Sequence, residues 1–297
     1  MVVRDGPDRA APLEVLMLRR SLRADFVGGA HVFPGGALDP TDATARAERV
    51  CTGRDDAGAS AILGVGSGGL AYWVAAVREC FEESGLLLAR TADGAIPAFD
   101  DPGVAARFSL HRERLHARAA SFLDVCEEED LTLDVGALHY FAHWITPEGA
   151  TRRYDTRFFV AAAPEHQTPT HDARETISEM WVRPADALER HRAGAMELIL
   201  PTICNLQAIG RFGTAADLLA AASALGDVPA ILPRVVAGSG GARVLLPGDP
   251  GYEDPAPAVP PDFDSAVRRA SMQAAEGTWG SQSLSPPRSR RSHDARG

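Results

Sequence analysis

Arg78-Glu79-Cys80-Phe81-Glu82-Glu83-Ser84-Gly85-Leu86 is the stretch of this 297-residue chain that decides its fold. No Gly or Pro interrupts residues 71–84, and the first half of that segment is apolar. The sequence therefore predicts a helix that ends at Gly85, because glycine is the residue that most often follows the last helical turn.

The three glutamates of this stretch point to metal chemistry. Residues three and four apart share one face of a helix, so Glu79, Glu82 and Glu83 are expected to lie close together, with Arg78 one turn from Glu82. Carboxylates this close repel one another, and a hard divalent cation, which prefers oxygen ligands, would relieve the repulsion. The alternative is a solvated, charged helix face.

A second motif lies upstream, in His31-Val32-Phe33-Pro34-Gly35-Gly36-Ala37-Leu38-Asp39. It is a strand-like run that ends in a Pro-Gly-Gly turn. Adjacent glycines allow close backbone approach and unusual dihedral angles. Such a turn can aim its carbonyls at a metal ion or its amides at a phosphate.

Together the two motifs resemble the signature of the Nudix hydrolases. That signature reads Gly, five residues, Glu, seven residues, then Arg-Glu-aliphatic-x-Glu-Glu-x-Gly-aliphatic. Gly36 matches the first Gly, and Arg78 to Leu86 match the last part. Three departures stand out: Asp42 replaces the first Glu, Cys80 replaces an aliphatic residue, and 35 residues (43–77) separate the two halves instead of seven.

The resemblance implies an α/β fold, an α/β/α sandwich around a mixed sheet, here with a helical insertion and C-terminal helices. It implies Mg²⁺ or Mn²⁺ as cofactor, held by Glu79, Glu83, Glu82 and the Gly36 carbonyl. Arg78 would orient the glutamates, so Arg78 and Glu82 count as catalytic residues. In the family a later loop also supplies a Glu that assists the metal site or acts as base; Glu175 is the candidate and Glu179 the alternative.

The later half of the chain resembles one branch of that family. The order 154–159 (Tyr-Asp-Thr-Arg-Phe-Phe), Glu175 and Trp181 is similar to the peroxisomal coenzyme A diphosphatases, over roughly residues 12–222. This implies hydrolysis of a nucleoside diphosphate-linked small molecule, coenzyme A or an acyl-CoA, to 3′,5′-ADP and a phosphopantetheine. ADP-ribose, dinucleotides, nucleoside triphosphates and a binding module with little catalysis remain as alternatives.

Several residues are expected to bind the substrate phosphates. Arg19, Arg20 and Arg23 form a basic patch that suits the 3′-phosphate of coenzyme A, although a solvated strand end is the alternative. Arg157 is expected to reach a phosphate, unless an acid such as Asp155 holds it. Gly35 would contribute its backbone amide.

The remaining pattern divides the chain into segments. Residues 1–11 are expected to be an N-terminal extension, 12–225 the Nudix domain with its insert at 43–70, 226–246 a C-terminal extension, and 247–297 a disordered tail. Strands are predicted at 13–18, 26–33, 86–88, 135–145 and 153–161, and helices at 101–129, 184–192, 201–209 and 214–224. The apolar faces of the last two helices suit either the cover of a sheet or a subunit contact, hence a homodimer.

The composition, the cysteine spacing and the ends of the sequence argue against several classes of protein. The net charge of −10 argues against a nucleic-acid partner. The four cysteines form no CxxC pair, which argues against a zinc site or a disulfide framework, and Cys80 is expected to be a buried thiol. The chain shows no secretory signal, no apolar run that could span a membrane, and no peroxisomal C-terminal tripeptide. A cytoplasmic location is therefore expected.

Overall fold

A mixed sheet forms the centre of the molecule. The computed structural model describes residues 1–7, 13–22, 28–238, 241–254, 267 and 270–274. The strand order is β10-β7-β8-β1-β2-β3, with β9 on the other edge of β2. β1 runs parallel to β8 and β10 parallel to β7, whereas the other pairs are antiparallel. The bounds are β1 (Val2–Asp5), β2 (Leu13–Arg20), β3 (His31–Val32), β7 (His139–Ile145), β8 (Asp155–Ala162), β9 (Thr176–Val182) and β10 (Ala230–Ile231).

The first strand changes the expected domain boundary. Val3 of β1 is in register with Val15 of β2 on one side and with Ala162 of β8 on the other. Both Val2 and Val3 are buried. The segment 1–11, expected to be an extension outside the domain, therefore contributes a central strand of the sheet.

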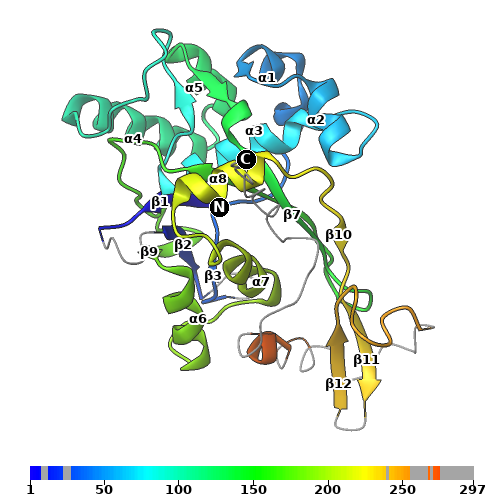
Figure 1. Ribbon diagram of the computed structural model, residues 1–297. Helices are drawn as coiled ribbons and strands as arrows, with labels where there is room; N and C mark the ends of the chain where they lie inside the picture. Colours follow the sequence, from blue (N-terminus) through cyan, green and yellow to red (C-terminus); the bar gives the residue numbers. More distant parts are fainter. Residues whose placement is uncertain (8–12, 23–27, 239–240, 255–266, 268–269, 275–297) are drawn as a thin grey trace, which may run out of the picture.

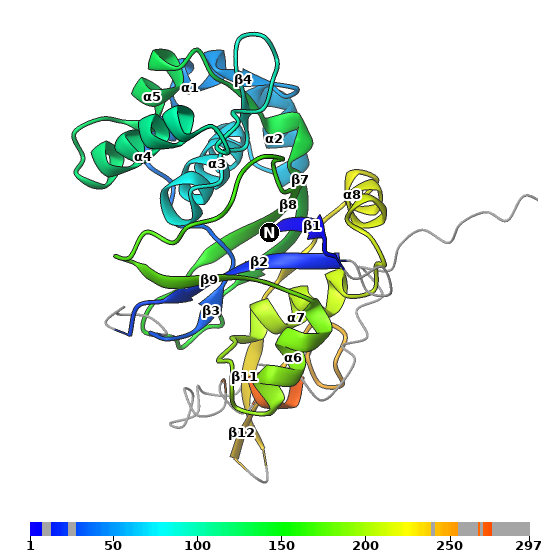
Figure 2. The same ribbon diagram turned by 90° about the vertical axis from the view of Figure 1, so that its left-hand side faces the viewer.

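Helices cover both faces of the sheet (Figures 1 and 2). Because successive side chains of a strand point to opposite faces, β2 serves two cores. Leu16 and Leu18 pack with Cys80, whereas Val15 and Met17 pack with the helices of the opposite layer. This confirms the α/β sandwich around a mixed sheet. The first layer holds α3 (Leu70–Ser84), and the second holds α6 (Pro184–Arg192), α7 (Leu200–Ile209) and α8 (Ala215–Ser223).

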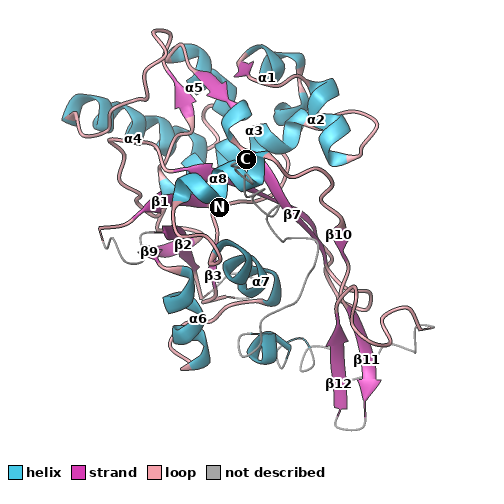
Figure 3. Ribbon diagram, in the orientation of Figure 1, coloured by secondary structure: helices cyan, strands magenta, loops and turns pink. Residues whose placement is uncertain are grey.

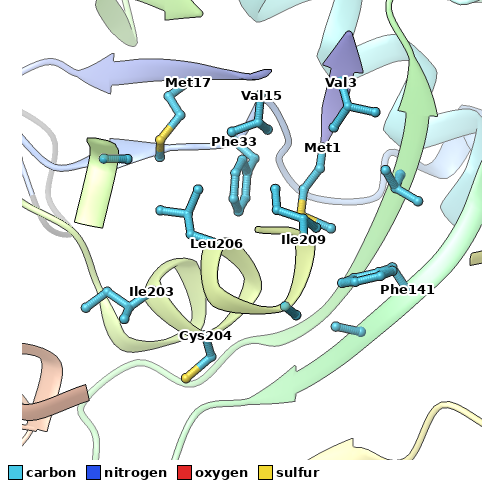
Figure 4. Packing of buried hydrophobic residues seen from close by; sticks show 14 of the residues in the cluster. Met1, Val3, Val15, Met17, Phe33, Phe141, Ile203, Cys204, Leu206 and Ile209 are labelled. Atoms are coloured by element: carbon cyan, nitrogen blue, oxygen red, sulfur yellow. The ribbon is translucent and has the colours of Figure 1, made fainter. Parts of the chain in front are cut away.

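The second layer explains the apolar faces of the C-terminal helices. Leu206 and Ile209 of α7 lie on the side of the helix that faces Val15 and Met17 of β2 (Figure 4), and Ile203 belongs to the same core. Leu218 of α8 belongs to the same core. These faces cover the sheet, so they do not need a second subunit to bury them.

The insert belongs to the first layer. It forms η1 (Pro40–Ala43), α1 (Ala45–Arg49), β4 (Cys51–Thr52) and α2 (Asp56–Leu63). Together with α4 (Pro102–His116) and α5 (Phe122–Glu128), these helices lie on the side of α3 away from the sheet (Figure 2). A small sheet, β4-β6-β5, with β5 (Ala89–Arg90) and β6 (Thr132–Asp134), completes this part.

The glycine-rich end of the insert is a packed turn. The backbone amides of Gly68 and Leu70 donate to the Asp56 carboxylate at 2.9 and 3.0 Å. The amide of Gly69 donates to Ser60 Oγ, and a Cβ on Gly69 would lie 2.4 Å from the Ser60 amide nitrogen. These backbone amides already have acceptors, so they are not free to bind a phosphate. The backbone of Gly69 also packs closely against Ser60, so the segment is a packed turn rather than a flexible hinge.

Some predicted elements are wrong or fall outside the described residues. Leu86 and Leu87 are a buried loop, and the strand follows at Ala89. The strand predicted from 26 begins at His31, with 23–27 outside the described residues, and η2 (Val135–Ala137) precedes β7.

The hairpin of β11 (Arg234–Gly238) and β12 (Gly241–Leu245) lies at the end of the molecule opposite α1 and α2 (Figure 3). Most of the tail, 255–266, 268–269 and 275–297, lies outside the described residues. No helix in the described part of the chain has the length and hydrophobicity to cross a bilayer.

Candidate active site

Helix α3 presents different faces to three neighbours. Trp73, Val77 and Phe81 belong to the core that also holds residues of the insert, α4 and α5, and the Trp73 ring meets Phe159 of β8 with ring centroids 4.7 Å apart. Cys80 packs with Leu16 and Leu18 of β2. The helix ends as predicted, because Gly85 adopts the left-handed conformation (φ 72°) and its amide donates to the Phe81 carbonyl. The remaining face carries the glutamates.

The Pro-Gly-Gly loop presses against these glutamates. The Gly35 amide donates to Glu83 Oε2 at 2.9 Å. A Cβ on Gly36 would lie 2.5 Å from the carboxyl carbon of Glu79, so a larger residue would displace that carboxylate. The two motifs quoted from the sequence therefore meet in space.

Arg78 joins the two halves of the interrupted signature. Its Nε and Nη2 donate to Asp42 Oδ1 and Oδ2 at 3.0 and 2.9 Å, and both side chains are buried. Nη2 also donates to the Ala37 carbonyl at 2.8 Å, and Nη1 donates to Glu79 Oε1 at 2.7 Å. Glu82 Oε2 lies 3.7 Å from Nη1. The paired arginine fixes the orientation of Glu79, as expected of an orienting residue.

One arginine does not neutralise the acidic group. Burial raises the pKa of Glu83 to about 8, and the charges of Glu79 and Glu175 add to the shift against the Gly35 hydrogen bond. Burial raises the pKa of Glu82 to about 7 although Arg78 opposes the shift. The pKa of Glu79 is raised by burial as well. Burial is the largest cause of each shift, and repulsion between the neighbouring carboxylates adds to it.

Glu175 lies within electrostatic reach of Glu79 and Glu83, because its charge raises the pKa of both. Its backbone is held on both sides: the amide donates to Asp172 Oδ2 at 3.1 Å, and the carbonyl accepts from the Ser21 amide at 2.8 Å. Glu179, the alternative, instead accepts hydrogen bonds from the amide and the ring Nδ1 of His171. The structure therefore places Glu175, rather than Glu179, with the glutamates of α3.

The basic patch expected to bind phosphate is divided between two faces of the sheet. Arg20 follows Leu18 on the α3 side, and its charge lowers the pKa of Glu83. Arg19 points to the opposite side, where its charge adds to burial in lowering the pKa of His31. The expectation that Arg19 acts with Arg20 is therefore wrong, because neighbouring residues of a strand cannot share a face. Arg23 lies outside the described residues.

Arg157 pairs with Asp155, which was the expected alternative to binding a substrate phosphate. Its Nη1 donates to Asp155 Oδ1 at 3.0 Å, and the guanidinium stacks on the Tyr72 ring at 4.3 Å from the centroid. Its side chain is only 7% exposed. The residue holds β8 against the start of α3.

Two residues near the glutamates gave no signal in the sequence. Arg112 of α4 donates from Nε to the Glu82 carbonyl at 2.9 Å. Asp172 accepts from the amides of Arg174, Glu175 and Thr176 and so shapes the loop that carries Glu175. Both contacts join segments far apart in the chain or depend on loop geometry, which no motif encodes.

The glutamates of α3 lie near one another but do not enclose a metal-ion site. Within the described ranges, no three carboxylate, imidazole or thiolate groups converge closely enough to enclose an ion. The thiol of Cys80 is buried and takes no part, since burial raises its pKa to about 11.

A mixed sheet between helical layers, with a glutamate helix against a Pro-Gly-Gly loop, defines a Nudix-type hydrolase. The chain is similar to the crystal structure of a NUDIX hydrolase from Alicyclobacillus acidocaldarius, with a TM-score of 0.54 and 26% identity over 74% of this chain and 92% of that one. The family model that describes the NUDT19 Nudix domain matches residues 67–209.

Two relatives that match most of the chain carry the same family name. The acyl-coenzyme A diphosphatase NUDT19 of Gallus gallus is 31% identical over 82% of this chain and 74% of its own length. The Homo sapiens protein of the same name is 30% identical over 83% of this chain and 75% of its own length. The chain belongs to the NUDT19 family of Nudix hydrolases. It is a Nudix diphosphatase, a hydrolase that acts on phosphorus-containing anhydrides.

Proposed function

We propose that this diphosphatase cleaves coenzyme A or an acyl-CoA to 3′,5′-ADP and phosphopantetheine or its acyl form. The observation that carries the proposal is the meeting of Glu79 and Glu83 of α3 with the Pro-Gly-Gly loop, where the Gly35 amide donates to Glu83 at 2.9 Å and Arg78 joins Asp42 to Glu79. The names of the two relatives, both acyl-coenzyme A diphosphatases, support the substrate class.

A divalent cation fits the donors of this site. The carboxylates of Glu79, Glu82 and Glu83 and the Gly36 carbonyl offer only oxygen, the donor that Mg²⁺ and Mn²⁺ prefer. Mg²⁺ commonly binds one or two carboxylates and keeps several waters, so it does not need a closed protein cage. Repulsion between the carboxylates adds to burial in raising the pKa values of Glu82 and Glu83, and a bound cation would relieve this repulsion. When bound, the ion supplies a water of lowered pKa and neutralises charge on the diphosphate.

The chain's own residues then have separate roles. Arg78, held by Asp42, keeps the Glu79 carboxylate in one orientation. The Gly35 amide does the same for Glu83. Glu175 is exposed and lies within electrostatic reach of Glu79 and Glu83, which supports its role as the group that accepts a proton from the attacking water.

The reaction needs no further reagent than water. The water oxygen forms a bond to one phosphorus, and the bond from that phosphorus to the bridging oxygen breaks. The bridging oxygen leaves with the other phosphate as a phosphomonoester. Glu175 takes the water proton and later releases it to solvent.

A mass-spectrometric substrate panel tests the proposal. Coenzyme A, acetyl-CoA, ADP-ribose, NADH and nucleoside triphosphates are incubated with the protein and Mg²⁺ or Mn²⁺, with Glu83→Gln as control. We expect 3′,5′-ADP from the first two compounds and its loss in the variant. Cleavage of another compound alone would contradict the coenzyme A assignment but keep the chemistry. A folded, metal-binding protein that cleaves nothing in the panel would contradict both.

A further inference from the structure

Two loops next to the glutamates carry arginines that the sequence did not single out. The chain leaves α4 at His116 and reaches Arg118 two residues later, where a left-handed backbone (φ 55°) turns it. From the loop before β9, Arg174 Nη1 donates to the His116 carbonyl at 3.4 Å. The two arginines therefore flank the same end of α4.

These two arginines differ from the others of the same helix region. Arg107 and Arg114 of α4 pair with Glu129 and Glu128 at 2.7 and 2.6 Å. Arg118 and Arg174 are exposed, and neither forms an ion pair with an acid of the described segments. An exposed guanidinium without a carboxylate keeps its full capacity for an anion.

Charges of both signs surround His116 at the end of α4. After burial, the charges of Arg112 and Arg174 lower the pKa of His116, whereas those of Asp172 and Glu175 raise it. Asp172 already accepts hydrogen bonds from three backbone amides and from the Thr176 hydroxyl. Its carboxylate is therefore engaged by its own loop, and in the described part of the chain it forms no ion pair with Arg118 or Arg174.

Two buried polar atoms of α4 also lack partners in the described structure. Arg112 and His116 are four residues apart, so they share a face of α4. Arg112 Nη2 and His116 Nε2 are both buried without a hydrogen bond in the described structure. Buried polar atoms in native proteins almost always have a hydrogen-bond partner, so two unpaired ones at the end of α4 are unusual.

This region borders the active site on two sides. Arg174 precedes Glu175 directly, and His116 lies within electrostatic reach of Glu175. Arg118 lies within reach of Asp39, three residues after Gly36 of the Pro-Gly-Gly loop. A substrate that places its diphosphate at the glutamates could extend another phosphate to the arginines.

We propose that Arg118 and Arg174 form a binding site for a phosphate group of the nucleotide half of the substrate. The inference rests on the proposed function, in which the substrate carries a diphosphate and a 3′-phosphomonoester. Guanidinium groups donate paired hydrogen bonds to phosphate oxygens, and a phosphomonoester carries nearly two negative charges. The place of the arginines, outside the ring of glutamates, suits the 3′-phosphate.

Direct binding provides the first test. Titration calorimetry measures 3′,5′-ADP and 5′-AMP against the wild type, Arg118→Gln, Arg174→Gln and the double variant. Arg192→Gln is the matched control, an exposed arginine of α6 across the sheet. We expect each single substitution to weaken 3′,5′-ADP binding roughly tenfold, as for one charged hydrogen bond, with 5′-AMP and the control unchanged. Unchanged binding of 3′,5′-ADP in the double variant would overturn the inference.

Kinetics then identify the phosphate. We expect kcat/KM of the double variant to fall for coenzyme A and to hold for 3′-dephospho-coenzyme A. An equal loss on both would support the phosphate site but assign it to the diphosphate. No loss on either would overturn it. If the wild type cleaves neither compound while 3′,5′-ADP binding still needs the arginines, the proposed reaction fails and the phosphate site stands.

Discussion

Two groups of three glutamates in this chain have opposite electrostatic environments. Glu127, Glu128 and Glu129 at the end of α5 each have a basic partner: Arg46 at 2.8 Å, Arg114 at 2.8 Å, and Arg107 at 2.7 Å with His111 at 2.8 Å. Their pKa values are lowered, those of Glu127 and Glu128 mainly by these hydrogen bonds. For Glu129 the partners outweigh a burial that alone would raise its pKa.

In the α3 group, Arg78 is held by Asp42, contacts Glu79 and lies 3.7 Å from Glu82, whereas Glu83 accepts from the Gly35 amide. The pKa values of these glutamates are raised, mainly by burial and also by repulsion between neighbouring carboxylates. Glutamate content alone therefore does not identify a metal site. What distinguishes the two groups is the burial of the α3 glutamates together with the smaller number of basic partners that the fold brings to them.

The largest expected effect comes from removing one charge in each group. Glu83→Gln should lower kcat by about 10²–10³-fold, the loss typical of a group that stabilises developing charge. Glu128→Gln should leave kcat unchanged. Steady-state assays on a cleaved substrate, with circular dichroism to show an intact fold, make the comparison. Similar losses in both variants would contradict it.

Removing an arginine that pairs with each group of glutamates should lower the free energy of unfolding by different amounts. Arg78→Ala leaves Asp42 buried without a partner and should cost about 3–5 kcal/mol of unfolding free energy. Arg114→Ala removes an exposed pair and should cost at most about 1 kcal/mol. Urea unfolding measures both. Equal costs would mean that the Arg78–Asp42 pair is no more buried in solution than a surface pair.

A smaller effect is expected at the loop that brings Glu175 to the α3 group. Asp172→Ala removes three backbone hydrogen bonds and releases Ala173 from its left-handed conformation (φ 57°). We expect kcat to fall about tenfold with KM little changed, as for an outer residue that positions a catalytic group. In a Glu175→Gln background the same substitution should add little, because coupled residues are not additive.

The matched control for that loop is Asp93→Ala. Asp93 also supports a turn through a backbone amide, that of Ala95, in the loop that follows β5. We expect its kcat to equal that of the wild type. Full additivity of Asp172→Ala and Glu175→Gln would show that Asp172 does not act through Glu175.

The smallest expected effect is the pH dependence of the metal-free protein. Glu82 and Glu83 have raised pKa values in the fold, about 7 and about 8, against 4.5 ordinarily. Their contribution to stability is present below the ordinary pKa and is lost as the pH rises through 7 and 8. The melting temperature in EDTA should therefore fall as the pH rises from about 5 to about 8, and less so in Glu83→Gln. Mg²⁺ should raise it more at pH 8.5 than at pH 6; a pH-independent effect of Mg²⁺ would contradict this explanation.

Local pattern predicted the elements that hold the site. The uninterrupted run before Gly85 located α3, and the Pro-Gly-Gly turn located the loop against it. The placement of Glu175 rather than Glu179 followed from resemblance and agrees with the geometry. These features depend on short-range sequence, which periodicity and glycine positions record directly.

Features that depend on distant segments were not predictable in this way. β1 is a strand only because β2 and β8 lie on either side of it. Arg19 and Arg20 look alike in sequence, but strand alternation sends them to different layers. The partner of Arg157 is two residues away, yet choosing it over a substrate needed the stack on Tyr72.

The buried pair of Arg78 and Asp42 closes a long loop. Loop closure loses about 0.6 kcal/mol for each doubling of length, so 35 intervening residues instead of seven lose about 1.4 kcal/mol more chain entropy. The insert offsets this loss because it is folded: Ala47, Ala59 and Leu63 are buried in the core that also holds α3. Assembly of the hydrolytic centre is therefore thermodynamically linked to the folding of the insert. A substitution such as Leu63→Ala, in a helix that carries none of the glutamates, would weaken the closed loop along with the core.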